Sequence, residues 1–111
     1  MNGERRIRYM RLVVFFDLPT DTPAQRKDYR TFRKFLIGEG YMMMQESVYV
    51  RLVTTDANAD FAIARLKINH PPQGLVQVLK VTEKQYASMV YVTGEHSNVG
   101  QVDTMEELVV L

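Results

Sequence analysis

The sequence predicts an α+β domain of ferredoxin-like type, with the element order β-α-β-β-α-β followed by additional C-terminal strands. Two observations support this prediction. Short runs rich in β-branched and aromatic residues alternate with two stretches of helical periodicity, and these stretches end at glycine or proline. The chain has 111 residues, 46% of them hydrophobic, which suits one core and leaves no room for a second. We therefore assign residues 1–92 to the ferredoxin-like domain, and residues 93–111 to a connector and C-terminal strand of the same domain.

The first strand is expected over residues 11–16, an unbroken Arg-Leu-Val-Val-Phe-Phe run typical of a strand buried on both faces. Asp17 follows at once, before the turn at residues 18–20. A carboxylate in this place is held by a rigid element yet can reach solvent, so it suits a metal ligand or an acid/base group. The alternative is that Asp17 only hydrogen-bonds the backbone of the turn.

The first helix is expected to begin after Thr22, which can cap it, with Pro23 in the first helical position and Gln25 completing a capping box. It should end near Gly38 or Gly40. On a helical wheel, one arc is apolar and the opposite arc carries five cations. The apolar arc holds Ala24, Tyr29, Phe32, Phe35 and Leu36, and the cationic arc holds Arg26, Lys27, Arg30, Arg33 and Lys34. The cationic arc is either a binding surface or a solvated helix face.

The remaining elements follow from the same patterns. Two strand-like runs, residues 41–45 and 47–53, precede a second helix that begins near Asp56 and stops before Pro71. A further strand covers residues 75–81. The next elements are a short helical turn opened by a capping box at residues 82–85, a strand at 89–92, a polar connector at 93–103 and an apolar strand at 108–111. This last strand either pairs within its own chain or covers the sheet edge of a second copy, which would make a two-fold dimer.

The charge is distributed unevenly, although the net charge is only +1. Residues 1–34 hold nine Lys or Arg and four acids, whereas the rest of the chain holds five and nine. A basic pole of this kind suits a polyanion. The candidate nucleic-acid-binding residues are therefore the five helix cations together with Arg5, Arg6, Arg8 and Arg11.

Several reaction classes and locations are disfavoured by what the sequence lacks. It has no cysteine, P-loop, Gly-x-Ser-x-Gly elbow or His-Glu-x-x-His motif, and neither His70 nor His96 has the surroundings of a catalytic base. Metal-assisted hydrolysis of a phosphodiester is the one reaction class that the residues favour. No stretch resembles a signal peptide or a membrane span, so we expect a cytoplasmic protein that does not enter a membrane.

Four motifs in order carry a resemblance to a known family. They are residues 11–20, the helix end at 32–36, Gln-Glu-Ser-Val-Tyr at 45–49 and residues 81–86. From about Tyr9 to Leu111, the chain resembles the small CRISPR-associated adaptation protein, the second of the two near-universal spacer-acquisition subunits. It looks most similar to versions from systems with a single large effector nuclease.

This resemblance implies a homodimer in which Asp17 faces its symmetry mate and the two Asp17 carboxylates share Mg²⁺. Ser47 and Tyr49 match the family's Ser-Val-aromatic signature and become possible neighbours of that site. The alternative for Tyr49 is a structural role, since it lies on one face of an alternating strand. The family includes metal-dependent endonucleases that act on RNA or DNA. It also supplies the central piece of the spacer integration complex, which spans duplex DNA of the protospacer and repeat array between two dimers of a larger CRISPR integrase subunit.

Three functional hypotheses follow. The leading one is a duplex-binding scaffold for spacer capture, supported by the cations and by the resemblance. The second is a free-standing Mg²⁺-dependent endonuclease on single-stranded RNA or duplex DNA, supported by Asp17. The third is a small-molecule-sensing ferredoxin-like dimer without a nucleic-acid partner, which would explain the fold and leave the one-sided cations unexplained.

Overall fold

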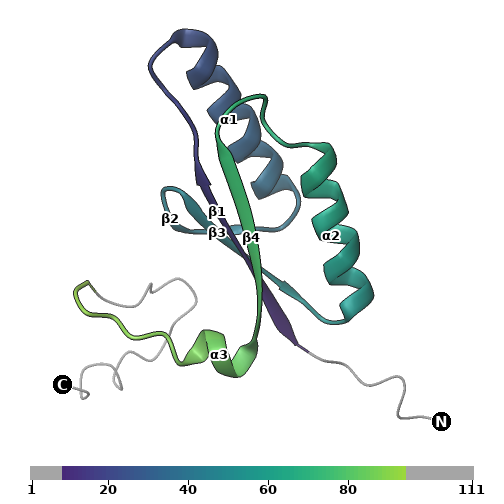
Figure 1. The fold of residues 1–111 in the computed structure, drawn as a ribbon. Helices are drawn as coiled ribbons and strands as arrows, with labels where there is room; N and C mark the ends of the chain where they lie inside the picture. Colours follow the sequence, from purple (N-terminus) through teal and green to yellow (C-terminus); the bar gives the residue numbers. More distant parts are fainter. Residues whose placement is uncertain (1–8, 95–111) are drawn as a thin grey trace.

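The computed structural model describes residues 9–94 and confirms the α+β fold (Figure 1). The elements in chain order are β1 (Met10–Asp17), α1 (Pro23–Gly38), β2 (Met42–Gln45), β3 (Val48–Val53), α2 (Asp56–Ile68), β4 (Leu75–Thr82) and α3 (Glu83–Ala87). Arg5, Arg6, Arg8 and the predicted strand at 108–111 lie outside the described residues. Within the described part of the chain, none of the helices combines the length and apolarity needed to cross a membrane.

The four strands form one antiparallel sheet in the order β2-β3-β1-β4. The central strand β1 pairs with β3 on one side and β4 on the other, so that Val13 lies between Val50 and Leu79. The connections β1-α1-β2 and β3-α2-β4 each join parallel strands and therefore cross over with the same hand. Both α1 and α2 consequently pack on one face of the sheet (Figure 1).

The core lies between this face and the two helices. Alternate residues of β1 point into it, together with side chains from β3, α1 and α2. The buried cluster comprises Met10, Leu12, Val14, Phe16, Phe32, Leu36, Tyr41, Tyr49, Val53, Ala59, Ala62 and Leu66. The ring of Phe16 meets three other aromatic rings in this core, with its centre 5.4 Å from that of Phe32 in an edge-to-face arrangement.

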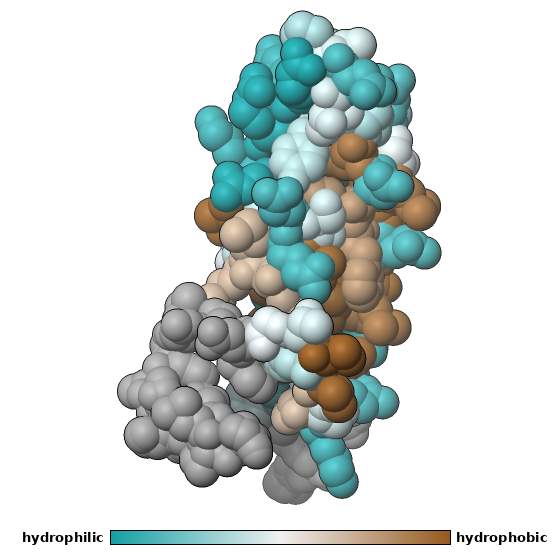
Figure 2. Space-filling view, turned by 90° about the vertical axis from the view of Figure 1, so that its left-hand side faces the viewer, coloured by the Kyte–Doolittle hydropathy of each residue, from teal (hydrophilic) through white to brown (hydrophobic). Residues whose placement is uncertain are grey.

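The opposite face, which we call the open face, carries no covering helix other than the short α3. The residues of β1 on this side are Arg11, Val13, Phe15 and Asp17, and 37% of Phe15 is exposed. The prediction that the first strand is buried on both faces therefore holds only in part on this side, where Val13 is buried among its neighbours but Phe15 and Asp17 are exposed, because both long helices pack on the other face. Figure 2 looks at the left-hand side of Figure 1 and shows apolar side chains gathered over the middle of the molecule, with polar ones above them.

Local signals placed the helix ends correctly. Thr22 Oγ1 accepts a hydrogen bond from the Gln25 amide at 3.1 Å, and Gln25 Oε1 accepts one from the Thr22 amide at 3.0 Å, which completes the predicted capping box. Of the predicted apolar arc, Phe32 and Leu36 are buried, whereas Ala24 is exposed because it lies in the first turn, ahead of the sheet.

An ion pair joins the ends of the two long helices. Arg65 donates from Nε and Nη2 to the two carboxylate oxygens of Glu39, at 2.7 and 2.9 Å, and its guanidinium lies 5.9 Å from the centre of the Phe35 ring. These hydrogen bonds from Arg65 lower the pKa of Glu39 below its usual value. The contact therefore fixes the end of α1 against α2 through a charge-assisted, bidentate pair.

The predicted strand at residues 89–92 is wrong. This segment has no strand structure, and Val90 and Val92 are largely exposed. The capping box of Thr82 and Gln85 starts α3 directly after β4, so the chain turns away before it can pair with a strand of its own sheet. A run with strand propensity forms a strand only when a neighbouring strand pairs with its backbone groups.

Candidate nucleic-acid interface and the Asp17 site

Asp17 ends β1, where it pairs with Leu75 of β4. Its side chain is exposed on the open face, on the same side of the strand as Phe15. The alternative that it serves only to bond the turn is not supported, because no hydrogen bond to its carboxylate is found among residues 9–94. The carboxylate is thus free to meet a ligand from solvent or from a second chain.

The backbone beneath Asp17 is tightly packed. Gly74 has a φ of +95°, and a Cβ atom there would lie 2.6 Å from Leu18 Cδ2 and 2.7 Å from the Asp17 carbonyl oxygen. Gln25 also donates to Gln73 Oε1 at 3.2 Å, which links the loop after β1 to the loop before β4. A depression of about 10 Å³ beside these loops suits a single water molecule. It is lined by Leu18, Pro19, Gln25, Asp28, Pro71 and Gln73.

The structure separates Tyr49 from Asp17. Tyr49 pairs with Val14, so its side chain enters the core on the helix side, and it is fully buried. The Ser47 carbonyl accepts a hydrogen bond from the Phe16 amide at 3.0 Å, which brings the β2–β3 turn next to the end of β1. Of the two predicted neighbours, only Ser47 lies near the Asp17 end of the strand.

All five predicted cations of α1 are exposed, and they fall into two groups. Arg26 and Arg33 are held by hydrogen bonds. Arg26 Nη1 donates to the carbonyl oxygens of Thr20 and Asp21 at 3.0 and 3.2 Å, and Arg33 Nε donates to the Tyr49 hydroxyl at 2.8 Å. Within the described part of the chain, the other three make no hydrogen bond or ion pair. These three are Lys27, Arg30 and Lys34.

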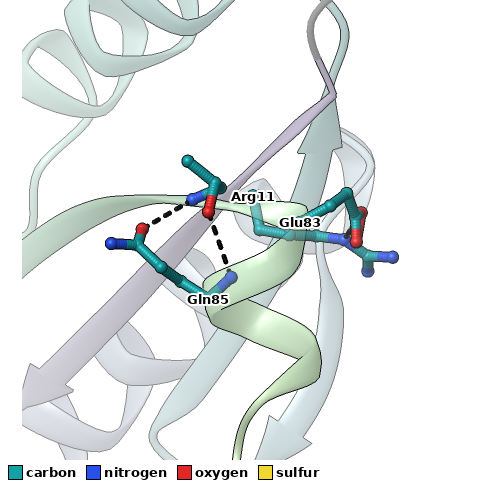
Figure 3. Close-up of polar contacts among 4 residues, drawn as sticks. Arg11, Glu83 and Gln85 are labelled. Atoms are coloured by element: carbon teal, nitrogen blue, oxygen red, sulfur yellow. Dashed lines mark hydrogen bonds and ion pairs between the residues drawn. The ribbon is translucent and has the colours of Figure 1, made fainter.

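Arg11 belongs to a separate contact. Its Nε lies 2.6 Å from Glu83 Oε2, and its guanidinium stands 4.5 Å from the centre of the Tyr86 ring. Figure 3 shows Arg11 reaching from β1 to Glu83 at the start of α3, beside the capping contacts of Gln85. Arg11 therefore anchors α3 and does not extend the cationic surface of α1.

Within the described residues, neither a histidine nor a cluster of metal-ligating side chains contributes to the site. His70 is exposed and its Nδ1 lies 2.7 Å from the Pro71 carbonyl oxygen, which suits a loop contact, and His96 lies outside the described residues. Among residues 9–94, no group of three or more His, Cys, Asp or Glu side chains gathers as a metal site would require. Within residues 9–94, Asp17 therefore belongs to no ready-made cluster of metal ligands.

Two features were missed at the level of sequence. One is the bond between Arg33 and Tyr49, and the other is the apolar open face. The sequence of β4 held a signal for the second, since Leu75 and Leu79 alternate with Val76 and Val78 and so place apolar side chains on both faces.

Comparisons with known proteins agree on one family. The family model described as CRISPR associated protein Cas2 matches residues 10–89. The CRISPR-associated endoribonuclease Cas2 of Treponema denticola is 51% identical over 102 residues, which cover 92% of this chain and 100% of that protein. The protein of the same name from Streptococcus mutans serotype c (strain UA159) is 51% identical over 86 residues, 78% of this chain and 79% of its own. The one from Ligilactobacillus salivarius is 48% identical over 86 residues, 78% of this chain and 85% of its own.

Proposed function

This chain belongs to the CRISPR associated protein Cas2 family, and from that membership we propose that it binds duplex DNA and bridges integrase dimers during spacer acquisition. The observation that carries the proposal is the exposed cationic face of α1. Lys27, Arg30 and Lys34 have no partner within the described residues, so they are available to phosphates. Binding through such a surface would be independent of sequence and steeply dependent on salt, because each neutralised phosphate releases condensed counterions.

A matched pair of charge reversals tests this proposal. Lys27→Glu/Lys34→Glu removes two unpaired cations of α1, whereas Lys67→Glu/Lys84→Glu makes the same change in net charge at two exposed lysines of α2 and α3. We expect the first variant to bind a duplex at least about tenfold more weakly at physiological salt, and the second to bind nearly as wild type. Equal losses in both variants would indicate a nonspecific effect of net charge and would contradict the proposed surface.

The open face supports a homodimer as the working form. A row of apolar side chains crosses the whole sheet on this side, from Met42 through Val50 and Val13 to Leu79. Packing this face against a second copy would cover the exposed members of the row and bring the two copies of Asp17 to the same interface, since Asp17 lies on that face. The bridging role follows from such symmetry, because a two-fold dimer offers each of two integrase dimers an identical surface.

A second candidate function is a Mg²⁺-dependent endoribonuclease, which is favoured by the names of the relatives and by the free Asp17 carboxylate. Mg²⁺ commonly takes one or two carboxylates and completes its octahedron with water and phosphate oxygens. A dimer through the open face would supply the two from Asp17 of each chain. When bound there, the ion would polarise a phosphoryl oxygen and lower the pKa of a coordinated water.

Asp17→Asn separates the two functions, with Asp21→Asn as the control for an exposed carboxylate in the adjacent loop. If the chain is a nuclease, RNA cleavage in Mg²⁺ is lost in Asp17→Asn and retained in the control. If its role in adaptation is that of a scaffold, spacer integration with the integrase persists in both variants. Cleavage that copurifies with Asp17→Asn would belong to a contaminant and would remove the nuclease hypothesis.

A further inference from the structure

Arg33 differs from the other cations of α1 because its partner is a buried side chain. Tyr49 is fully buried, and its ring lies 5.7 Å from that of Phe16 in the core. Its hydroxyl accepts a hydrogen bond from Arg33 Nε at 2.8 Å. A side chain fixed by packing on all sides thus sets the position of one guanidinium on an exposed surface.

The bond leaves most of the guanidinium available. Arginine carries five N–H donors in a planar fork, and Tyr49 uses only the one on Nε. Neither Nη1 nor Nη2 of Arg33 has a partner among the described residues, and the residue is exposed. These two nitrogens can donate parallel hydrogen bonds to two oxygens of one phosphate.

A second arginine on the same face is fixed by other means. Arg26 is bonded to the carbonyl oxygens of Thr20 and Asp21, and Arg26, Arg30 and Arg33 are spaced as i, i+4 and i+7 along one stripe of α1. The two fixed guanidiniums therefore belong to residues about 10 Å apart along the helix axis, with the unpaired Arg30 between them. A surface fixed in this way loses less conformational freedom when it binds than a set of unrestrained side chains would.

We propose that Tyr49 is a positioning residue for phosphate binding, whose hydroxyl holds the Arg33 guanidinium with its Nη1 and Nη2 edge turned to the backbone of a nucleic-acid duplex. The inference rests on the proposed duplex binding and adds a specific role for a core residue. It assigns to the aromatic member of the Ser-Val-Tyr motif a function at the surface of α1, on the side of the sheet away from Asp17.

The test is a double-mutant cycle on duplex affinity, measured with the full chain by fluorescence anisotropy over a range of salt concentrations. Tyr49→Phe removes only the hydroxyl, and we expect it to weaken binding by about three- to tenfold. Arg33→Ala should weaken binding further and reduce the slope of log K against log salt by about 0.9. In the Arg33→Ala background, Tyr49→Phe should have no further effect, because the group that it positions is gone.

Tyr41→Phe provides the matched control. Tyr41 is also a buried tyrosine of the core, but its hydroxyl bonds no cation of α1 within the described residues. We expect its variant to bind the duplex as wild type does. An equal loss in Tyr41→Phe, or a loss in Tyr49→Phe that persists in the Arg33→Ala background, would reflect general loosening of the core and would overturn the inference.

The outcomes also separate this inference from the proposed function. If Arg33→Ala weakens binding and Tyr49→Phe does not, duplex binding stands and the positioning role is overturned. If the wild-type chain does not bind a duplex, both the proposed duplex binding and the positioning role of Tyr49 are overturned. Should Tyr49→Phe fail to fold, Arg33→Lys keeps the charge but cannot bond both Tyr49 and a phosphate through a planar fork. A weakened Arg33→Lys variant would then support the inference, and wild-type affinity would overturn it.

Discussion

The two faces of the sheet are built from the same strands and are equally apolar, yet their side chains are buried to different extents. Leu12 and Val14 of β1 are fully buried under the helices, whereas Phe15, between Val14 and Phe16, is 37% exposed on the open face. Leu79 of β4 is 53% exposed on that side as well. Apolar content alone therefore does not decide burial in this molecule. The position of the two long helices does, because both crossovers deliver them to one side.

The open face is continuous rather than scattered. The residues that pair across its strands, Met42, Val50, Val13 and Leu79, form one row, in which the two central members are buried and the two outer ones are exposed. Single exposed apolar residues are ordinary on protein surfaces, but a contiguous apolar row that crosses a whole sheet is typical of an interface. We therefore expect the helix-covered face to determine folding and the open face to determine association.

The largest effect should come from two adjacent phenylalanines. Phe16→Ala removes a ring of the covered core that meets three other aromatic rings and should lower the free energy of unfolding by about 3–5 kcal/mol. Phe15→Ala on the open face should cost the monomer about 1 kcal/mol or less, since the side chain already meets solvent. Urea unfolding of both variants under dilute conditions measures the difference. Equal losses would show that the two faces are packed alike.

Gly74→Ala tests the tight packing beneath Asp17, at the end of the sheet. The positive φ and the close approach to Leu18 and the Asp17 carbonyl should cost up to about 3 kcal/mol of unfolding free energy. Gly38→Ala is the control, because nothing lies within 4 Å of its Cβ position, and it should be neutral or slightly stabilising. Thermal melts that rank the two variants the other way would contradict the tight packing described beneath Asp17.

Leu75→Glu/Leu79→Glu places charge on the open face and tests its role in association. The dissociation constant of the proposed homodimer should rise at least about tenfold, or about 1.4 kcal/mol, while the monomer stays folded. The control is Phe61→Glu/Ile68→Glu, which charges two exposed apolar residues on the outer side of α2. Light scattering over a dilution series measures the dissociation of the dimer in both variants. A dimer that survives the first variant and dissociates in the second would place the interface on α2.

What the sequence could predict depends on how local the deciding contacts are. The capping boxes at Thr22 and Thr82 were predictable, because each involves residues three apart. The ion pair of Arg11 with Glu83 was not, because its partners are 72 residues apart and meet only through the pairing of β1 with β4. The strand at residues 89–92 was predicted wrongly for a related reason, since propensity supplies no partner.

The same limit applies to the candidate site. The place of Asp17 at the end of a strand followed from a local pattern and is confirmed. The separation of Tyr49 from Asp17 required knowing which face of β3 the helices cover. An alternating strand fixes which residues share a face, but the face that becomes the core is decided by elements elsewhere in the chain.

The smallest expected effect concerns the charges on the helix-covered side. The hydrogen bonds from Arg65 lower the pKa of Glu39 from its ordinary value of 4.5, so Glu39 binds its proton less readily in the folded than in the unfolded chain. Its contribution to stability is therefore present above about pH 4.5 and is lost as the pH falls through the lower, folded-state pKa. Glu39→Gln should flatten this part of the dependence of the melting temperature on pH. Glu46→Gln, which changes an exposed carboxylate with no hydrogen bond from the described residues, should not. Wild-type and Glu39→Gln melting curves that shift equally with acid would mean that the joint between α1 and α2 does not depend on this pair.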